Sequence, residues 1–158
     1  GGPVWFVVDE LDALGAIDGL KDALTRLRKY DGRCVLGIQS IAQLTGTYGA
    51  PAAQTIVENC GNTLLLRCSA GEQGGTSRYA SMLIGEREVL RTQRSRSRPA
   101  GFGRGERTRS ESIQHHVERA VLPAEIEQLA DLEGYLKLAS DPSWRRVRVE
   151  PGSAPRRS

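Results

Sequence analysis

The sequence has few cysteines and aromatic residues, and it has no long apolar run. Its three cysteines, Cys34, Cys60 and Cys68, are an odd number without C-x-x-C spacing, which argues against a disulfide framework and against a zinc site. We expect them to be reduced, buried, small hydrophobic residues, as in a cytosolic protein. No apolar stretch approaches the roughly 20 residues that a membrane span needs, and no basic-then-apolar leader indicates a secretory signal.

The overall composition of the sequence is that of an ordinary globular domain. The 158 residues are 39% hydrophobic and 26% charged, with a formal net charge of +3. The positive charge is distributed unevenly, because seven arginines and one acidic residue, Glu106, lie from Arg91 to Arg109. Such a segment can bind a phosphate backbone through its charge, and it can equally be a solvated flexible loop. The candidate DNA contacts within it are Arg94, Arg96, Arg98 and Arg104.

The order of apolar segments predicts strands that alternate with helices. Continuous apolar runs at 4–8, 34–38 and 63–67 are typical of strands in parallel sheets that are covered on both faces. Helices are expected at 19–30, 40–44, 51–59 and 77–84, with a turn through Gly46 and Gly49. Strands and helices that alternate at this spacing imply a parallel sheet with crossover helices.

The second half of the chain has a different pattern. Short strands are expected at 88–93, 113–121, 134–139 and 146–149, and a short helix begins at Pro123. Residues 94–112, rich in Arg, Ser and Gly, are predicted to form a flexible loop or hairpin tip. The expected fold is therefore α/β, with one domain over residues 1–150 in which helices flank a mainly parallel sheet with an antiparallel end. Residues 151–158 are expected to be a disordered tail.

Two acidic residues follow the first predicted strand. Asp9 and Glu10 directly follow the apolar run at 4–8, which is the Walker B pattern of P-loop NTPases. The carboxyl end of a strand in an open α/β sheet faces the crevice where ligands bind. In this interpretation Asp9 holds Mg²⁺, through water, and Glu10 polarises the water that attacks the γ-phosphate of ATP. The alternative is a strand that merely ends in two acids at the edge of the sheet.

Gln39 follows the second predicted strand. Neighbouring parallel strands would place its amide beside Asp9 and Glu10, where it could sense the γ-phosphate and pass its presence to neighbouring elements. The alternative is a glutamine that caps the following turn. Two consecutive strands that both end in residues of this kind favour the nucleotide-site interpretation.

Several short motifs occur together in one order. They are DELDAL at 9–14, LKDALT at 20–25, RK at 28–29, GIQS at 37–40, QL at 43–44, YG at 48–49, LPAEI at 122–126 and Leu132. As a set they resemble the DNA-binding ATPase domain of conjugative type IV secretion coupling proteins, the TraD and TrwB group. The resemblance extends over about residues 4–149, nearly the whole chain.

The resemblance implies the C-terminal half of a RecA-like P-loop NTPase domain that assembles as a hexameric ring. It implies an anchor at the bacterial inner membrane, on its cytoplasmic face, and ATP and Mg²⁺ as cofactors. The implied partners are single-stranded DNA, a relaxase or relaxosome, and the proteins of the secretion channel. On the matching positions, Asp9 and Glu10 are the Walker B acids and Gln39 is the sensor glutamine. Arg28 lies where a trans-acting arginine finger has been considered, with a solvent-facing helix arginine as the alternative.

One motif of this family is missing from the chain. No G-x-x-x-x-G-K-[ST] sequence occurs, and the glycine-rich residues 71–76 have no lysine and are expected to be a loop. Because the chain also begins with Gly1-Gly2-Pro3, we expect it to be part of a longer protein whose upstream part supplies the phosphate loop and the membrane anchor. The isolated chain should then not hydrolyse ATP. The competing hypothesis is a non-catalytic module that binds nucleic acid or recruits secretion substrates.

Overall fold

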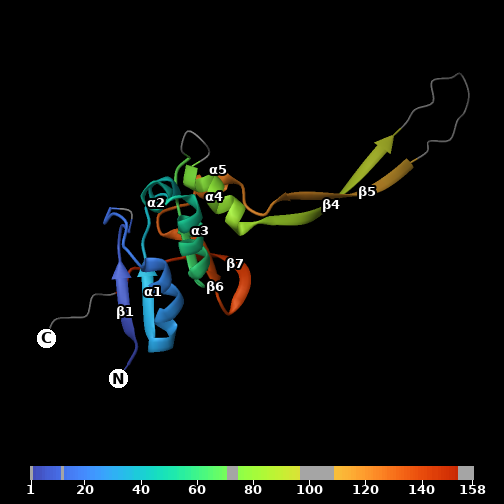
Figure 1. Cartoon of the computed structure of the whole chain (residues 1–158). Helices are drawn as coiled ribbons and strands as arrows, with labels where there is room; N and C mark the ends of the chain where they lie inside the picture. The colour runs from blue at the N-terminus through green and yellow to red at the C-terminus, as the bar shows by residue number, and fades with distance from the viewer. Residues whose placement is uncertain (1, 12, 71–74, 97–108, 153–158) are drawn as a thin grey trace, which may run out of the picture.

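The computed structural model describes residues 2–11, 13–70, 75–96 and 109–152, with the backbone alone for 93–96 and 109–112. The chain forms a body of strands and helices and one long two-stranded arm that extends away from it (Figure 1). No helix among the described residues has both the length and the hydropathy needed to cross a membrane.

The first two strands form a parallel pair. β1 (Val4–Val8) and β2 (Gly32–Leu36) pair in register along their full length. The strand predicted at 4–8 is confirmed, and the second strand begins and ends two residues earlier than predicted. The expected burial of β1 on both faces is wrong for the described chain, because residues 4–7 are 48–72% exposed. An apolar run shows that a strand is suited to burial, but not which segment covers it.

A helix whose last turn is tighter connects these strands. α1 (Leu20–Arg26) continues as the 3-10 helix η1 (Leu27–Tyr30), so the helix predicted at 19–30 is confirmed in extent. It ends at Asp31, whose φ of 54° is left-handed. The Asp31 N–H donates to the carbonyl of Arg28, which is a common way to end a helix.

Two consecutive helices follow β2 and build the first core. The Ser40 hydroxyl accepts a hydrogen bond from the Gln43 N–H at 3.1 Å and so caps α2 (Ile41–Tyr48). α2 is longer than predicted, since Gly46 lies inside the helix and the chain turns only at Gly49, before α3 (Ala50–Asn59). A glycine within a helix costs only about 1 kcal/mol, which packing against the core offsets. The buried residues of this core are Leu11, Leu20, Leu44, Ala53 and Ile56.

A second sheet is antiparallel and has the order β3–β6–β7. Its strands are β3 (Thr63–Leu66), β6 (Glu133–Leu138) and β7 (Asp141–Arg148). The predicted α/β fold with an antiparallel end is confirmed, but the prediction of a mainly parallel arrangement is wrong for the described residues. Only β1 and β2 pair in parallel there, and β3 belongs to the antiparallel end. Gly134 allows the contact, because a Cβ there would lie 2.4 Å from the Leu65 carbonyl oxygen. An apolar pattern predicts that β3 is a strand but cannot specify a partner that lies about 70 residues away in the sequence.

The second core lies between this sheet and two further helices. α4 (Gly75–Ile84) and the short α5 (Pro123–Glu127) pack together, as the neighbouring ribbons in Figure 1 show. The buried apolar residues are Ala80, Ile126 and Leu129, with Tyr135 of β6 packed against them. The helix predicted at 77–84 is confirmed but begins two residues earlier. Residues 75 and 76 of the predicted glycine-rich loop therefore belong to α4, so that part of the loop prediction is wrong, and residues 71–74 lie outside the described residues. The helix predicted to begin at Pro123 is confirmed.

The arm is formed by β4 (Glu86–Arg96) and β5 (Arg109–Arg119), paired antiparallel along their full length. The predicted loop at 94–112 is therefore wrong at both ends, where residues 94–96 and 109–112 belong to paired strands. Its middle, 97–108, and residues 153–158 of the predicted tail lie outside the described residues. An exposed two-stranded ribbon buries no face, so the polar composition of this segment gave no indication of a strand.

Candidate functional site

The ends of β1 and β2 bring the predicted acids and the glutamine to one edge of the parallel pair. Asp9 and Glu10 directly follow β1, and Gln39 lies three residues beyond β2. Two backbone hydrogen bonds extend the pairing past the strands: the Gly37 N–H donates to the last carbonyl of β1 at 2.8 Å, and the Gly37 carbonyl accepts from the Leu11 N–H at 2.9 Å. All three predicted side chains are exposed here. Their shared position agrees with the proposed site, and their roles remain predictions.

Gly37 is a part of this edge that the sequence alone did not single out. A Cβ at this position would lie 2.7 Å from Oδ1 of Asp9, closer than real Cβ contacts come. Only glycine therefore leaves the Asp9 carboxylate in place. A glycine directly after an apolar strand, two residues before a candidate sensor, is the pattern that could have revealed it.

The backbone of Glu10 is held in an uncommon conformation. Its φ of 50° is left-handed, which is rare and costly for a residue with a side chain. The Asp9 Oδ1 accepts a hydrogen bond from the Glu10 N–H at 3.1 Å, and the next residue, Leu11, is fully buried. The anchored leucine and the carboxylate hydrogen bond together hold Glu10 pointing out from the end of β1. Residues in such strained conformations cluster at functional sites.

Arg28 lies at the other end of the parallel pair. It belongs to η1, three residues before Asp31, whose carbonyl accepts a hydrogen bond from the Val4 N–H at the start of β1 at 3.2 Å. The length of β1, five residues or about 17 Å at 3.3 Å per residue, therefore separates Arg28 from Asp9. Within one chain Arg28 does not join the acids. An action on a neighbouring copy stays a prediction.

The four arginines proposed to contact DNA do not lie at this edge. Arg94 and Arg96 belong to β4, near the outer end of the described part of the arm, whereas Arg98 and Arg104 lie outside the described residues. Figure 1 shows that the arm extends from the side of the body that carries α4 and α5, away from β1. The candidate DNA contacts are thus separate from the edge that carries Asp9, Glu10 and Gln39, which we call the acidic edge.

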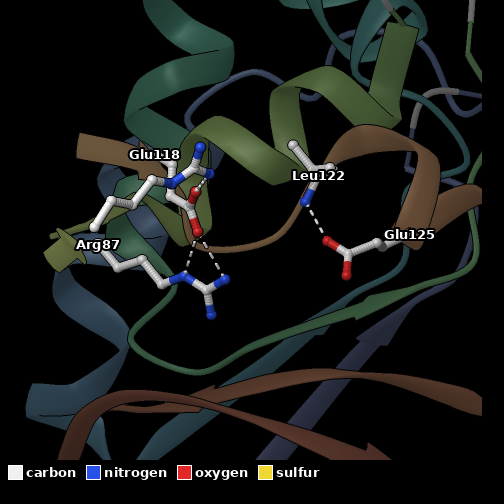
Figure 2. A network of polar contacts seen from close by, with 5 residues as sticks. Arg87, Glu118, Leu122 and Glu125 are labelled. Atoms are coloured by element: carbon white, nitrogen blue, oxygen red, sulfur yellow. Dashed lines mark hydrogen bonds and ion pairs between the residues drawn. The ribbon is translucent and has the colours of Figure 1, made fainter. Parts of the chain in front are cut away.

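At the root of the arm, one carboxylate holds two arginines. Glu118 accepts a hydrogen bond from Arg87 at 2.9 Å (Figure 2). It also accepts one from Arg91 at 3.1 Å. The hydrogen bond from Arg87 is the main cause that lowers the pKa of Glu118. Glu125 accepts a hydrogen bond from the Leu122 N–H at 2.6 Å in the same view and so caps α5. Arg87 and Arg91 are therefore engaged within the chain.

The cysteines and the described titratable groups offer no second site of this kind. Cys34, Cys60 and Cys68 are free thiols that are half-buried, rather than fully buried as expected. Burial raises the pKa of each thiol, and the neighbouring Cys34 adds to the effect on Cys60. Among the described residues, no group of three or more His, Cys, Asp or Glu side chains could hold a metal ion.

The described residues also line a cavity of about 670 Å³. Its lining comes from α2, α3 and α4 and from the β6–β7 hairpin, and includes Val57, Tyr79 and Trp144. None of the predicted site residues lines it. The predicted chemistry is therefore located on an open edge and not in this cavity.

The sequence matches a known family over nearly its whole length. Residues 3–150 match the DNA-binding domain of type IV secretion-system coupling proteins. The chain therefore belongs to this family, as the resemblance of its motifs predicted.

Individual relatives agree with this assignment. Coupling protein TraD of Escherichia coli (strain K12) is 31% identical over 137 residues, which are 85% of this chain and 18% of TraD. The type IV secretion system-coupling protein VirD4 of Bartonella henselae is 31% identical over 125 residues, which are 79% of this chain and 18% of that protein. The chain thus spans less than a fifth of the length of either relative.

Solved structures of the plasmid coupling protein TrwB have the same fold. TrwB in complex with ADP and Mg²⁺ is 33% identical, with a TM-score of 0.74 over 99% of this chain and 32% of that chain. TrwB in complex with a non-hydrolysable ATP analogue is 31% identical, with a TM-score of 0.76 over 99% of this chain and 33% of that chain. The predicted fold class, the C-terminal portion of a RecA-like domain, is confirmed.

Proposed function

We propose that this chain is part of an ATPase motor that moves single-stranded DNA into a type IV secretion channel. The observation that carries the proposal is the edge of the parallel pair that Asp9, Glu10 and Gln39 share, with Gly37 keeping the space that Asp9 needs. The TrwB structures with ADP and Mg²⁺ and with an ATP analogue support a nucleotide as the ligand. Membership of the coupling protein DNA-binding domain family supports DNA as the transported partner.

The residues at this edge fit part of a Mg²⁺–ATP site. Mg²⁺ prefers oxygen ligands and keeps several waters, which suits an exposed carboxylate such as Asp9. The hydrogen bond from the Glu10 N–H to Oδ1 of Asp9 fixes the orientation of that carboxylate. A phosphate-binding loop would come from another part of the full-length protein, because the chain has no such sequence. When bound, Mg²⁺–ATP supplies the phosphoryl group whose transfer to water releases the energy.

Each residue of the edge has a distinct proposed role. Asp9 binds the metal through water, and Glu10 orients and polarises the attacking water. Gln39 contacts the γ-phosphate and reports its presence. Arg28, which points to solvent at the far end of β1, would act on the nucleotide of a neighbouring copy. That role requires a ring, and we propose a hexamer at the cytoplasmic face of the bacterial inner membrane that receives DNA from a relaxosome.

The test is DNA-stimulated ATP hydrolysis by the full-length protein with Glu10→Gln. The substitution keeps the size of the side chain and removes its ability to take a proton, so hydrolysis should fall by at least about 100-fold while nucleotide binding survives. Glu58→Gln is the matched control, because Glu58 is an exposed acid of α3 that accepts a hydrogen bond from Gln54 and does not belong to this edge. It should hydrolyse ATP as the unchanged protein does.

Two results would contradict the proposal. The first is normal hydrolysis by the Glu10→Gln protein, which would remove the acidic edge from the chemistry. The second is an unchanged full-length protein that binds DNA but hydrolyses no ATP. That outcome would favour a non-catalytic module that binds nucleic acid or recruits secretion substrates.

A further inference from the structure

The segment that carries Gln39 is attached to α4, which lies 35 residues further along the chain. Ile41 is the first residue of α2, and its N–H is one of the helix-end donors that has no partner within its own helix. It donates to the hydroxyl Oγ1 of Thr76 at 3.2 Å. Thr76 is half-buried in the first turn of α4. The sensor segment and α4 therefore meet through one side-chain hydrogen bond.

The other end of α4 is attached to the root of the arm. Ser81 is fully buried, and its hydroxyl donates to the Val121 carbonyl at 2.6 Å. Beyond the helix, the Gly85 N–H donates to the Ser81 carbonyl at 3.2 Å, and the Gly85 carbonyl accepts from the Ala120 N–H at 3.0 Å. β4 thus begins, and β5 ends, beside backbone that is bonded to the last turn of α4.

Further contacts attach α4 to its neighbours between these two ends. Ser77 is fully buried and donates to the Glu127 carboxylate at 2.7 Å, while Ala80 belongs to the second core with Ile126. A helix of ten residues is about 15 Å long, and an arm of eleven residues is about 36 Å long. For a helix and an arm that turn together about the root of the arm, a tilt that moves the Thr76 end by 1 Å moves the outer end of the arm by about 2 Å.

We propose that Thr76 is the positioning residue that couples the nucleotide edge to the arm. A change at Gln39 shifts the start of α2, the Thr76 hydrogen bond passes that shift to α4, and α4 reorients the arm that carries Arg94 and Arg96. This inference rests on the proposed function, in which the edge binds nucleotide and the arm contacts DNA. It assigns a route between the two places, which the site residues alone do not provide.

The experiment uses the full-length protein with Thr76→Val and Thr76→Ser. Valine keeps the branched shape and removes the oxygen that accepts from Ile41, whereas serine keeps the oxygen. We expect Thr76→Val to keep its DNA affinity and its basal hydrolysis within about twofold, and to lose stimulation by DNA by about fivefold or more. Thr76→Ser should restore most of the stimulation. Thr55→Val is the matched control, since the Thr55 hydroxyl donates to the Pro51 carbonyl within its own helix.

The outcomes separate this inference from the proposed function. If Thr76→Val is stimulated by DNA as strongly as the unchanged protein, Thr76 is not the coupling residue. If basal and stimulated hydrolysis fall together and serine does not restore them, Thr76 has only a structural role and the inference is wrong. A protein that lacks DNA-stimulated hydrolysis before any substitution instead contradicts the proposed function. Should Thr76→Val fail to fold, Ser81→Ala tests the same route at the arm end of α4 and should lose stimulation likewise.

Discussion

The substitution Gly37→Ala isolates one steric contact at the acidic edge. The φ of Gly37 is not left-handed, so alanine brings no backbone strain of its own. Its methyl group would lie 2.7 Å from the Asp9 Oδ1, whereas ordinary contact begins at 3.4 Å, so the two must separate by 3.4 − 2.7 = 0.7 Å. The carboxylate is exposed and can move, so we expect a loss of about 1 kcal/mol in the free energy of unfolding, at the lower end for overpacked positions.

The displaced carboxylate should affect function more than stability. Catalytic groups must stay within about 0.5 Å of their productive positions, and a shift of this size should lower ATP hydrolysis by the full-length protein about tenfold. Gly46→Ala is the matched control, because Gly46 lies in the exposed part of α2 with nothing within 4 Å of an added Cβ. It should stabilise the protein by about 0.5–1 kcal/mol and leave hydrolysis unchanged.

Urea denaturation and steady-state hydrolysis of the two variants measure both effects. Equal hydrolysis by Gly37→Ala and the unchanged protein would refute the reasoning, because it would show that the position of Asp9 does not matter. A large loss of hydrolysis in Gly46→Ala would refute it as well, since the effect would then not depend on contact with the carboxylate.

Two further predictions concern the antiparallel sheet and the arm. Gly134→Ala places a methyl group 2.4 Å from the Leu65 carbonyl oxygen, a backbone atom that cannot move away. The substitution should lower the free energy of unfolding, measured in urea, by about 3 kcal/mol. An unchanged urea midpoint would contradict the observed β3–β6 pairing. Arg87 and Arg91 lower the folded-state pKa of Glu118, so its contribution to stability is present above the ordinary glutamate pKa and is lost as the pH falls through the lowered value. The difference in melting temperature between the unchanged protein and Glu118→Gln should therefore be present at neutral pH and disappear in acid, and a difference that is constant with pH would exclude this cause.

Local patterns predicted most elements of the body. The apolar run at 4–8 determined β1 to the residue, and Pro51 in the first turn located α3 within one residue. Parallel pairing also placed Gln39 at the same edge as Asp9 and Glu10, because neighbouring parallel strands end on the same side of a sheet. These features depend on short-range periodicity and on a single topological rule, both of which a sequence contains.

Features that depend on distant contacts were not predictable in the same way. Gly37 matters only because its Cα approaches the Asp9 carboxylate, 28 positions earlier in the chain. The arm has no buried face, so neither its length nor the strand positions of Arg94 and Arg96 were visible in the apolar pattern. The location of Arg28 at the far end of β1 follows from the way in which η1 leads into β2, and composition gives no information about it.

The exposed face of β1 determines how the stability of this chain would be measured. Burial of apolar surface stabilises a fold by about 25 cal/mol per Å², and the exposed side chains of residues 4–7 lack most of that contribution here. Any partner that covers this face stabilises the folded chain by mass action. For a second copy of the chain as that partner, the melting temperature of the isolated chain rises with protein concentration. The melting temperature of this chain would then depend on the protein concentration at which it is measured as well as on the chain itself.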